Sequence, residues 1–121
     1  MFWTRIERRL VDDLVVLDVY GRVTLTEQSR PLAETIREIL AGGARKIIVN
    51  LSNVQFIDSV GIGDIVRGYT AARREGGVLK LCGAAGRVRT VFEATQLTGV
   101  IELFETEGEA RRSFAEPAPS L

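Results

Sequence analysis

Apolar positions along the chain follow two periods, one typical of strands and one typical of helices. Strand-like runs of aliphatic and β-branched residues occupy residues 14–20 (LVVLDVY), 46–51 (KIIVNL) and 78–82 (VLKLC), and a shorter run covers 100–104. Residues 4–10 are compatible with an edge strand, and Asp12-Asp13 supplies the turn that would pair it with the following strand in a hairpin. The pattern therefore predicts a sheet that begins with a hairpin.

Between these strands, apolar residues recur at the three- and four-residue spacing of amphipathic helices. A first helix is expected at about residues 26–41, where Pro31 fits only the first turn and favours Ser29 as the N-cap. A second helix is expected to begin at Ser59, which is itself a good N-cap. Two further helices are expected after the loop 83–86 and after Thr106.

Strands that alternate with helices indicate an α/β fold with right-handed parallel crossovers. Residues 1–115 are expected to form a single domain, and residues 116–121, which contain two prolines, a flexible tail. One face of the predicted sheet is apolar, whereas Asp18, Asn50 and Lys80 fall on the opposite face. A sheet with both faces fully covered needs apolar residues on both. We therefore expect the helices to pack mainly on one face.

The residue types that the chain lacks limit the functions it could have. The 121 residues balance 16 Lys and Arg against 16 Asp and Glu, so no net charge draws the chain to nucleic acid or to an acidic membrane. The chain has no His and one Cys, which excludes an intrachain disulfide and a thiolate metal cluster. No apolar run approaches the ~20 residues of a membrane span, and signal-peptide features are lacking, so a cytoplasmic location is expected.

These absences argue against an enzyme and against a metal or organic cofactor. Ser59 has no His to activate it as a nucleophile. Cys82, at the end of an apolar strand, is expected to be a structural residue. The loop from Gly83 to Gly86 lacks the Gly-Lys-Ser/Thr signature of a phosphate-binding loop. A nucleotide-binding domain that uses this loop and Asp58 remains an alternative.

The segment from Asn50 to Asp64 (NLSNVQFIDSVGIGD) is the strongest candidate for a functional site. An apolar strand ends, the chain loops back toward the core, and Asp58-Ser59 open a helix that contains Gly61 and Gly63. A helix cap and glycines that permit close packing explain these residues by structure alone. A glycine inside a helix costs about 1 kcal/mol relative to Ala. A close approach to the backbone is therefore expected here, and a bound partner is one candidate for it.

This segment resembles the signature of the STAS domain family, the anti-sigma-factor antagonists of bacteria, in which an apolar strand and a short loop lead to Asp-Ser-Ser/Thr-Gly and an amphipathic helix. Here it reads IIVNLSNVQFIDSVGIGDIV. The earlier VVLDVYGRVT and the later VLKLCGAAGRVRTVFEATQLTGVIELFET resemble other strands and helices of the family, so the resemblance covers nearly the whole chain. It implies an α/β fold with a small mixed β-sheet and about four helices packed mainly on one face.

The resemblance also implies a function. Unphosphorylated members bind an anti-sigma factor, a serine kinase of the GHKL type, and so free a sigma factor for transcription. The kinase phosphorylates the Ser that follows the Asp of the motif, and a phosphatase reverses the modification. That Ser corresponds to Ser59. The implied partner-binding residues are Thr24, Asp58, Ser59, Val60, Gly61, Ile62 and Gly63.

Two positions depart from the family pattern. Val60 stands where members commonly have a second hydroxyl residue, and Thr24 stands where they usually have Asp. The acceptor serine is kept, so phosphorylation is still expected, whereas the identity of the partner is less closely implied. The alternative within the same fold is a STAS scaffold, or an accessory subunit of a transporter, that never cycles phosphate.

Overall fold

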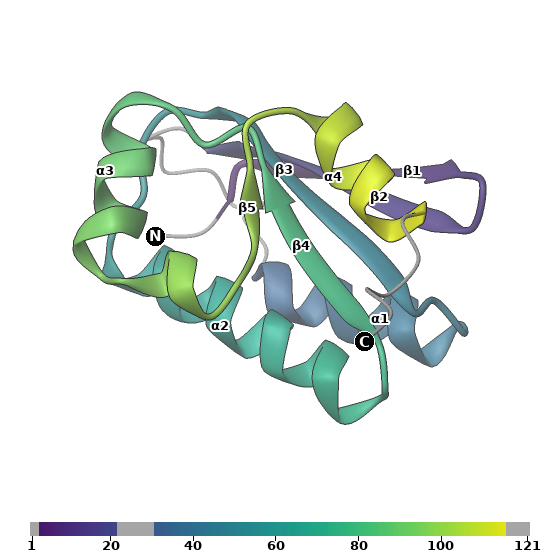
Figure 1. The fold of residues 1–121 in the computed structure, drawn as a ribbon. Helices are drawn as coiled ribbons and strands as arrows, with labels where there is room; N and C mark the ends of the chain where they lie inside the picture. Colours follow the sequence, from purple (N-terminus) through teal and green to yellow (C-terminus); the bar gives the residue numbers. More distant parts are fainter. Residues whose placement is uncertain (1–2, 22–30, 116–121) are drawn as a thin grey trace.

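The computed structural model describes residues 3–21 and 31–115, which form a five-stranded mixed sheet and four helices (Figure 1). The elements in chain order are β1 (Arg5–Val11), β2 (Leu14–Gly21), α1 (Leu32–Ala41), β3 (Lys46–Val54), α2 (Ser59–Arg74), β4 (Val78–Cys82), α3 (Gly86–Ala94), the 3-10 turn η1 (Leu97–Gly99), β5 (Leu103–Phe104) and α4 (Glu107–Ala115). The strand order is β1-β2-β3-β4-β5. The hairpin β1–β2 is antiparallel and every other pair is parallel, which confirms the predicted mixed α/β fold.

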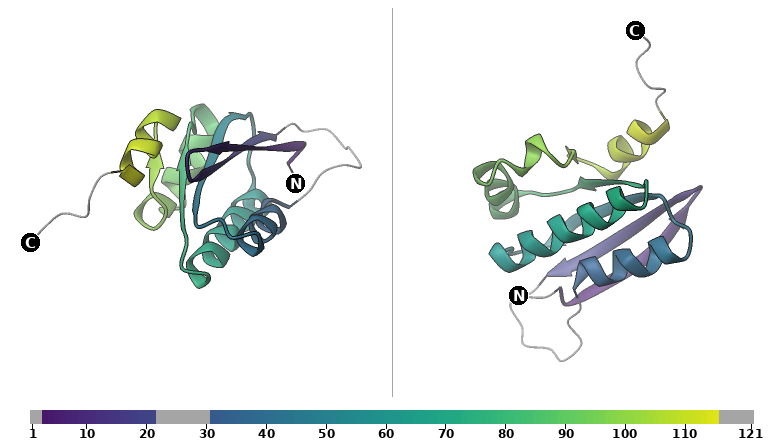
Figure 2. Two further views of the ribbon diagram at one scale, coloured as in Figure 1. Left: turned by 90° about the vertical axis from the view of Figure 1, so that its right-hand side faces the viewer. Right: turned by 90° about the horizontal axis from the view of Figure 1, so that it is seen from below.

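The two faces of the sheet are covered differently. Helices α1 and α2 lie side by side across one face, and α4 lies on the other (Figure 2). Apolar residues of α3 join the core on the α1–α2 side. The apolar face of the predicted sheet forms part of that core. Its buried residues are Leu17, Val19, Ile47, Val49, Leu51, Leu79 and Leu81. The helices therefore do pack mainly on one face.

The polar residues predicted on the opposite face are there, but α4 buries two of them. Asp18 and Lys80 are only 7% and 8% exposed, and Asn50 is half-buried. Arg9 donates two hydrogen bonds to the Asp18 carboxylate, from Nε at 2.5 Å and Nη2 at 2.9 Å, and Asn50 Nδ2 donates a third at 2.8 Å. The Arg9 guanidinium holds the pKa of Asp18 below its ordinary value. Paired in this way, the carboxylate remains charged beneath the helix.

Helix α4 is fastened to this face by both polar and apolar contacts. Arg9 also binds Glu107 in the first turn of α4, with Nη2 at 2.5 Å from Oε1. Lys80 donates to Ser113 Oγ at 2.8 Å, and its ammonium lies 4.5 Å from the centre of the Phe114 ring. The helix begins as the sequence predicts, because Thr106 Oγ1 accepts a hydrogen bond from the Glu109 amide at 3.1 Å.

Three boundaries differ from the sequence prediction. Strand β3 runs three residues further than expected, because its last residues pair with the end of β2 beyond a register shift. Strand β5 contains only Leu103 and Phe104, since Val100 instead closes the turn η1 through a bond from its amide to Leu97 O. Helix α1 begins at Leu32, with Pro31 in the N-cap position. The predicted cap Ser29 lies outside the described residues.

The first turn of α1 is capped by a side chain from α2. Pro31 offers no cap hydrogen bond. The carboxylate of Asp64, which is 1% exposed, accepts hydrogen bonds from the backbone amides of Leu32 and Ala33, the latter at 3.0 Å. The same carboxylate accepts from Trp3 Nε1 at 2.7 Å. One buried group thus joins the N-terminal segment, α1 and α2.

Replacing this carboxylate by an amide is expected to weaken the fold. The substitution Asp64→Asn would put an NH₂ group where the wild type has an acceptor oxygen, so buried N–H donors lose their partner at a cost of about 2–3 kcal/mol. The matched control is Asp13→Asn, which removes an exposed ion pair with Lys46 (2.6 Å) and should cost under about 1 kcal/mol. Urea unfolding followed by circular dichroism measures both, and equal midpoint shifts would contradict the role of Asp64.

Close packing of α1 against α2 depends on Gly68. A Cβ atom at this position would overlap Ile36 Cδ1 of α1, and the backbone of Ala33 lies 3.7 Å away. Both Gly68 and Ile36 are buried. The glycine thus lets the two helices meet with only a side-chain tip between them.

Gly68→Ala is accordingly expected to destabilise the protein by about 1–3 kcal/mol through overpacking. In an Ile36→Val background, which lacks Cδ1, the same substitution should be neutral or stabilising, because Ala is about 1 kcal/mol better than Gly in a helix. Gly63→Ala is the control, since a Cβ there meets the flexible tip of Arg67, at 3.3 Å. Denaturant midpoints of the single and double variants test this. Additive effects at Gly68 and Ile36 would contradict the steric explanation.

Candidate functional site

The candidate site lies where β3 leads into α2, at the carboxyl edge of the parallel strands (Figure 1). Residues 55–58 connect the two elements. Ile57 turns inward and is buried, whereas Phe56 is 38% exposed. The buried Ile57 fixes the end of the loop, and the helix that follows starts at a defined place beside it.

Asp58, and not Ser59, is the N-cap of α2. Its backbone is extended, and its Oδ1 accepts hydrogen bonds from the amides of Val60 and Gly61, both at 3.0 Å. The hydrogen bond from the Gly61 amide is the main cause that lowers the pKa of Asp58, and the bond from the Val60 amide acts in the same direction. The sequence prediction that Ser59 caps this helix is therefore wrong, because in an Asp-Ser pair either residue has the chemistry of a cap and the geometry selects the first.

Ser59 occupies the first helical position and is exposed. Its neighbour Val60 is 46% exposed, which is high for a large apolar residue next to a helix cap. The amides of Val60 and Gly61 are already bonded to Asp58. These two amides are therefore not available to a group attached to the Ser59 hydroxyl, which would also be next in the chain to the Asp58 carboxylate.

The two glycines of the segment have different surroundings. A Cβ at Gly61 would lie 2.9 Å from Ile57 Cγ1 and 3.4 Å from Trp3 Cη2, so the close approach expected there comes from within the protein. No bound partner is needed to explain Gly61. Gly63 is half-buried. A Cβ at this position would lie 3.3 Å from Nη1 of Arg67, at the end of a flexible side chain.

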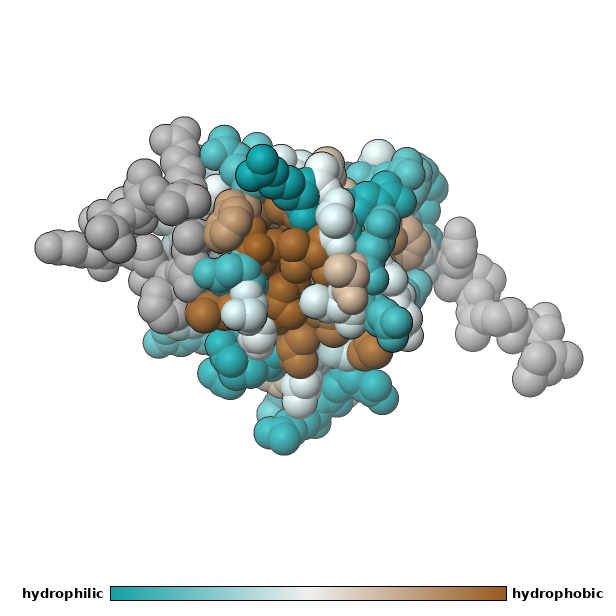
Figure 3. Space-filling view, turned by 90° about the vertical axis from the view of Figure 1, so that its left-hand side faces the viewer, coloured by the Kyte–Doolittle hydropathy of each residue, from teal (hydrophilic) through white to brown (hydrophobic). Residues whose placement is uncertain are grey.

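Apolar surface gathers on the face where α3 and the start of α2 lie (Figure 3). Close to Ser59 in the sequence, the large apolar side chains of Phe56 and Val60 are exposed, and Ile62 is half-buried against the core. Tyr69 of α2 donates to the Val100 carbonyl at 3.2 Å, which ties η1 to the same helix. The segment thus presents a polar hydroxyl beside apolar surface, as protein-binding surfaces do.

Six of the seven sequence-predicted site residues are contiguous and described, from Asp58 to Gly63. The seventh, Thr24, lies outside the described residues. Sequence reasoning did not connect Trp3 to this site, although its ring lies beneath Gly61. No local pattern carries that information, because the contact joins the N-terminal segment to residues nearly sixty positions away.

Three other candidate features are a reactive cysteine, a metal site and a membrane-spanning helix. Cys82 is buried, and burial raises the pKa of its thiol to about 12, so it is a poor nucleophile, as its expected structural role requires. Among the described residues, no group of acidic or Cys side chains is arranged to hold a metal ion. Within the same residues, none of the helices has the length and apolar character needed to cross a membrane.

Comparison with known proteins identifies the family. The STAS domain model matches residues 5–110. The anti-sigma-B factor antagonist of Staphylococcus aureus is 33% identical over 89 residues, which cover 74% of this chain and 76% of that protein. An anti-sigma factor antagonist from Mycobacterium paratuberculosis has the same fold, with a TM-score of 0.79 at 20% identity over 93% of this chain and 94% of the other. The chain belongs to the STAS domain family, as its motifs predict.

A second solved structure shares this fold. SpoIIAA of Bacillus, solved in its phosphorylated form, matches with a TM-score of 0.63 at 23% identity. The match covers 91% of this chain and 99% of that one. At this identity the comparison shows the common fold.

The new assignment of the cap predicts a ranking of stabilities. Asp58→Ala should lower the free energy of unfolding by about 1 kcal/mol, because the amides of Val60 and Gly61 lose their acceptor. Ser59→Ala should change it by less than about 0.5 kcal/mol, since an exposed first-turn serine contributes no cap here. Urea denaturation at neutral pH compares the two. The difference in unfolding free energy between Asp58→Ala and the wild type should shrink as the pH falls below about 4. The ionised carboxylate accepts these hydrogen bonds more strongly than the protonated acid, which is why its pKa is lowered, and acid removes that advantage. If Ser59→Ala lost more unfolding free energy than Asp58→Ala, the cap would be Ser59 and not Asp58.

Proposed function

We propose that this protein is an anti-sigma factor antagonist, a binding protein and not an enzyme. In its unmodified form it binds an anti-sigma factor serine kinase of the GHKL type and so releases a sigma factor. Phosphorylation of Ser59 by that kinase ends the binding, and a phosphatase restores it. Such a switch operates in the cytoplasm, where sigma factors direct transcription.

The observation that supports this proposal most directly is the position of Ser59. Its side chain is exposed at the first position of a 16-residue helix, beside the exposed Val60. A kinase can reach the hydroxyl without unfolding any part of the chain. The names of the curated relatives agree, because the Staphylococcus aureus protein is an anti-sigma-B factor antagonist.

The surroundings of Ser59 favour a switch that acts on docking and not on folding. A phosphate adds about −1.5 to −2 charge at pH 7. At this position the nearest helix amides already bind Asp58, so the phosphate gains little from capping, and the Asp58 carboxylate repels it. The positive end of the helix partly offsets that repulsion. The fold is therefore expected to tolerate the modification.

A docked partner, by contrast, would cover the phosphate. The neighbouring surface is apolar at Val60 and Phe56, so binding there removes water from the site. Burying a dianion next to a second carboxylate is unfavourable. If this costs about 3 kcal/mol, the affinity falls by roughly two orders of magnitude. A difference of that size is sufficient to exchange partners.

The first test is whether Ser59 is the acceptor. The purified chain, incubated with the anti-sigma factor kinase of the same organism and ATP, should gain one phosphate at Ser59, as located by mass spectrometry. Ser59→Ala should abolish the incorporation. Thr98→Ala, which removes an exposed hydroxyl on η1, is the matched control and should be phosphorylated like the wild type. Phosphate uptake by Ser59→Ala would disprove the proposed acceptor.

The second part of the test measures binding to the same kinase by calorimetry. Ser59→Ala should bind as tightly as the unmodified wild type. Ser59→Asp should bind at least about tenfold more weakly, although one carboxylate carries less charge than a phosphate. Both variants should unfold at wild-type urea concentrations. Tight binding by Ser59→Asp and by the phosphorylated chain would favour a STAS scaffold that does not cycle phosphate.

A further inference from the structure

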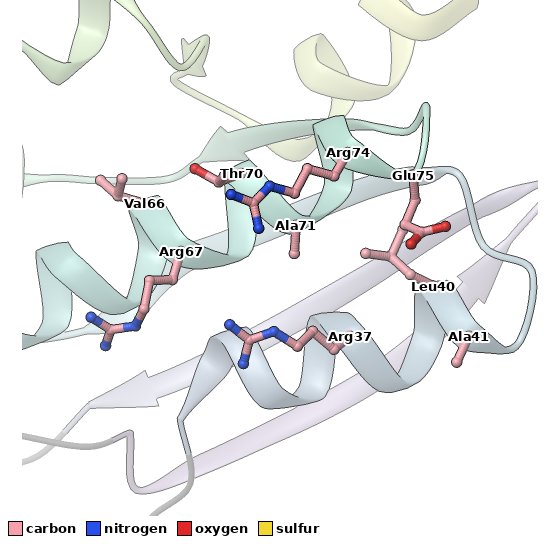
Figure 4. Close-up of a pocket in the computed structure, with 9 residues that line it drawn as sticks. All are labelled: Arg37, Leu40, Ala41, Val66, Arg67, Thr70, Ala71, Arg74 and Glu75. Atoms are coloured by element: carbon pink, nitrogen blue, oxygen red, sulfur yellow. The ribbon is translucent and has the colours of Figure 1, made fainter.

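A groove of about 550 Å³ runs between α1 and α2 on the outer side of the helical layer, away from the sheet (Figure 4). Arg37 comes from α1, and Arg67 and Arg74 come from α2, and the three side chains line the groove (Figure 4). Glu75 is the one acidic residue among those that line the groove. The groove is thus locally cationic in a chain whose formal net charge is zero.

The arginines of the groove have few carboxylate partners. In the part of the chain that the structure describes, five arginines form ion pairs within 3.5 Å, and these are Arg5, Arg8, Arg9, Arg89 and Arg111. Within that same part, neither Arg37 nor Arg74 has a carboxylate partner. Arg67 reaches only to 3.8 Å from Asp64, whose carboxylate is already taken by three N–H groups. Glu75 and the distant Asp64 are therefore the carboxylates that the described residues bring near three arginines, and the groove keeps an excess of positive charge.

An anion placed in the groove would interact favourably with arginines from both helices. Guanidinium groups present planar pairs of donors that match the oxygen atoms of phosphate. The wall of the groove adds apolar surface from Leu40, Val66 and Ala71, and Thr70 offers a hydroxyl. Its volume lies within the range of about 300–1,000 Å³ that is typical of sites for small molecules.

We propose that the groove between α1 and α2 binds a small soluble organic phosphate, with the phosphate held by Arg37, Arg67 and Arg74 and the organic part against the apolar wall. The site is separate from Ser59. On the α2 side, the groove is lined by residues between Val66, in α2, and Glu75, which follows the helix. With a rise of 1.5 Å per residue, these residues lie about 10–24 Å from Ser59 along the helix axis. The two surfaces can thus be tested one without the other.

The probes are inorganic pyrophosphate and ADP, titrated into the full chain by isothermal calorimetry at low and at physiological salt. Saturable binding that weakens with salt is expected for both, with ADP the tighter because it also covers apolar surface. Arg37→Gln and Arg74→Gln should each weaken ADP binding by about tenfold. Arg87→Gln removes an exposed arginine of α3 outside the groove and should leave it unchanged. Amide shifts at Thr70 and Ala71 in NMR spectra should follow the titration.

Three results would overturn the proposal. One is the absence of saturable binding of either probe at millimolar concentration. Another is an equal loss in Arg87→Gln, which would mean a diffuse charge effect and no site. The third is binding to phosphatidylcholine vesicles that contain phosphatidylglycerol, sensitive to Arg37 and Arg74, with none to ADP or pyrophosphate. That result would assign the groove to a lipid surface. None of these outcomes depends on whether Ser59 is phosphorylated.

Discussion

The arrangement of the helical layer depends on one buried carboxylate. Asp64 lies in the first half of α2, on its buried side, and is satisfied by three N–H donors, from Trp3, Leu32 and Ala33. A buried charge of this kind is tolerated only when its oxygen atoms are fully hydrogen-bonded. Meeting that requirement fixes where α1 starts, how it crosses α2 and where the N-terminal segment enters the core. The start of α2, which carries Ser59, is held from below by the same set of contacts.

The sequence predicts most of the fold because the strands and helices have clear local periods. The hairpin, the face occupied by Asp18 and Lys80, and the Thr106 cap are all visible as short-range patterns. What could not be predicted depends on contacts between distant residues. The carboxylate that caps α1 is more than thirty positions away, and the residue that caps α2 is one of two adjacent candidates. The motif singles out Ser59 as the candidate acceptor, and the structure adds that its side chain is exposed.

Helix α2 presents two surfaces of opposite character. Its first turn combines a capping carboxylate with exposed apolar residues, and its later turns carry arginines that face α1. Between them, Gly68 keeps α1 in direct contact with α2. The first-turn surface and the arginine-lined groove therefore belong to different stretches of one helix.

The placement of Trp3 has a practical consequence. It is the single tryptophan of the chain, and its indole is 3% exposed, hydrogen-bonded through Nε1 and close to Gly61, two residues after Ser59. Indole emission responds to polarity and hydrogen bonding around the ring, and no second indole obscures it. The protein therefore contains an intrinsic optical probe at the base of its candidate site. Its fluorescence reports changes around Gly61 and Asp64 in real time, without any attached label.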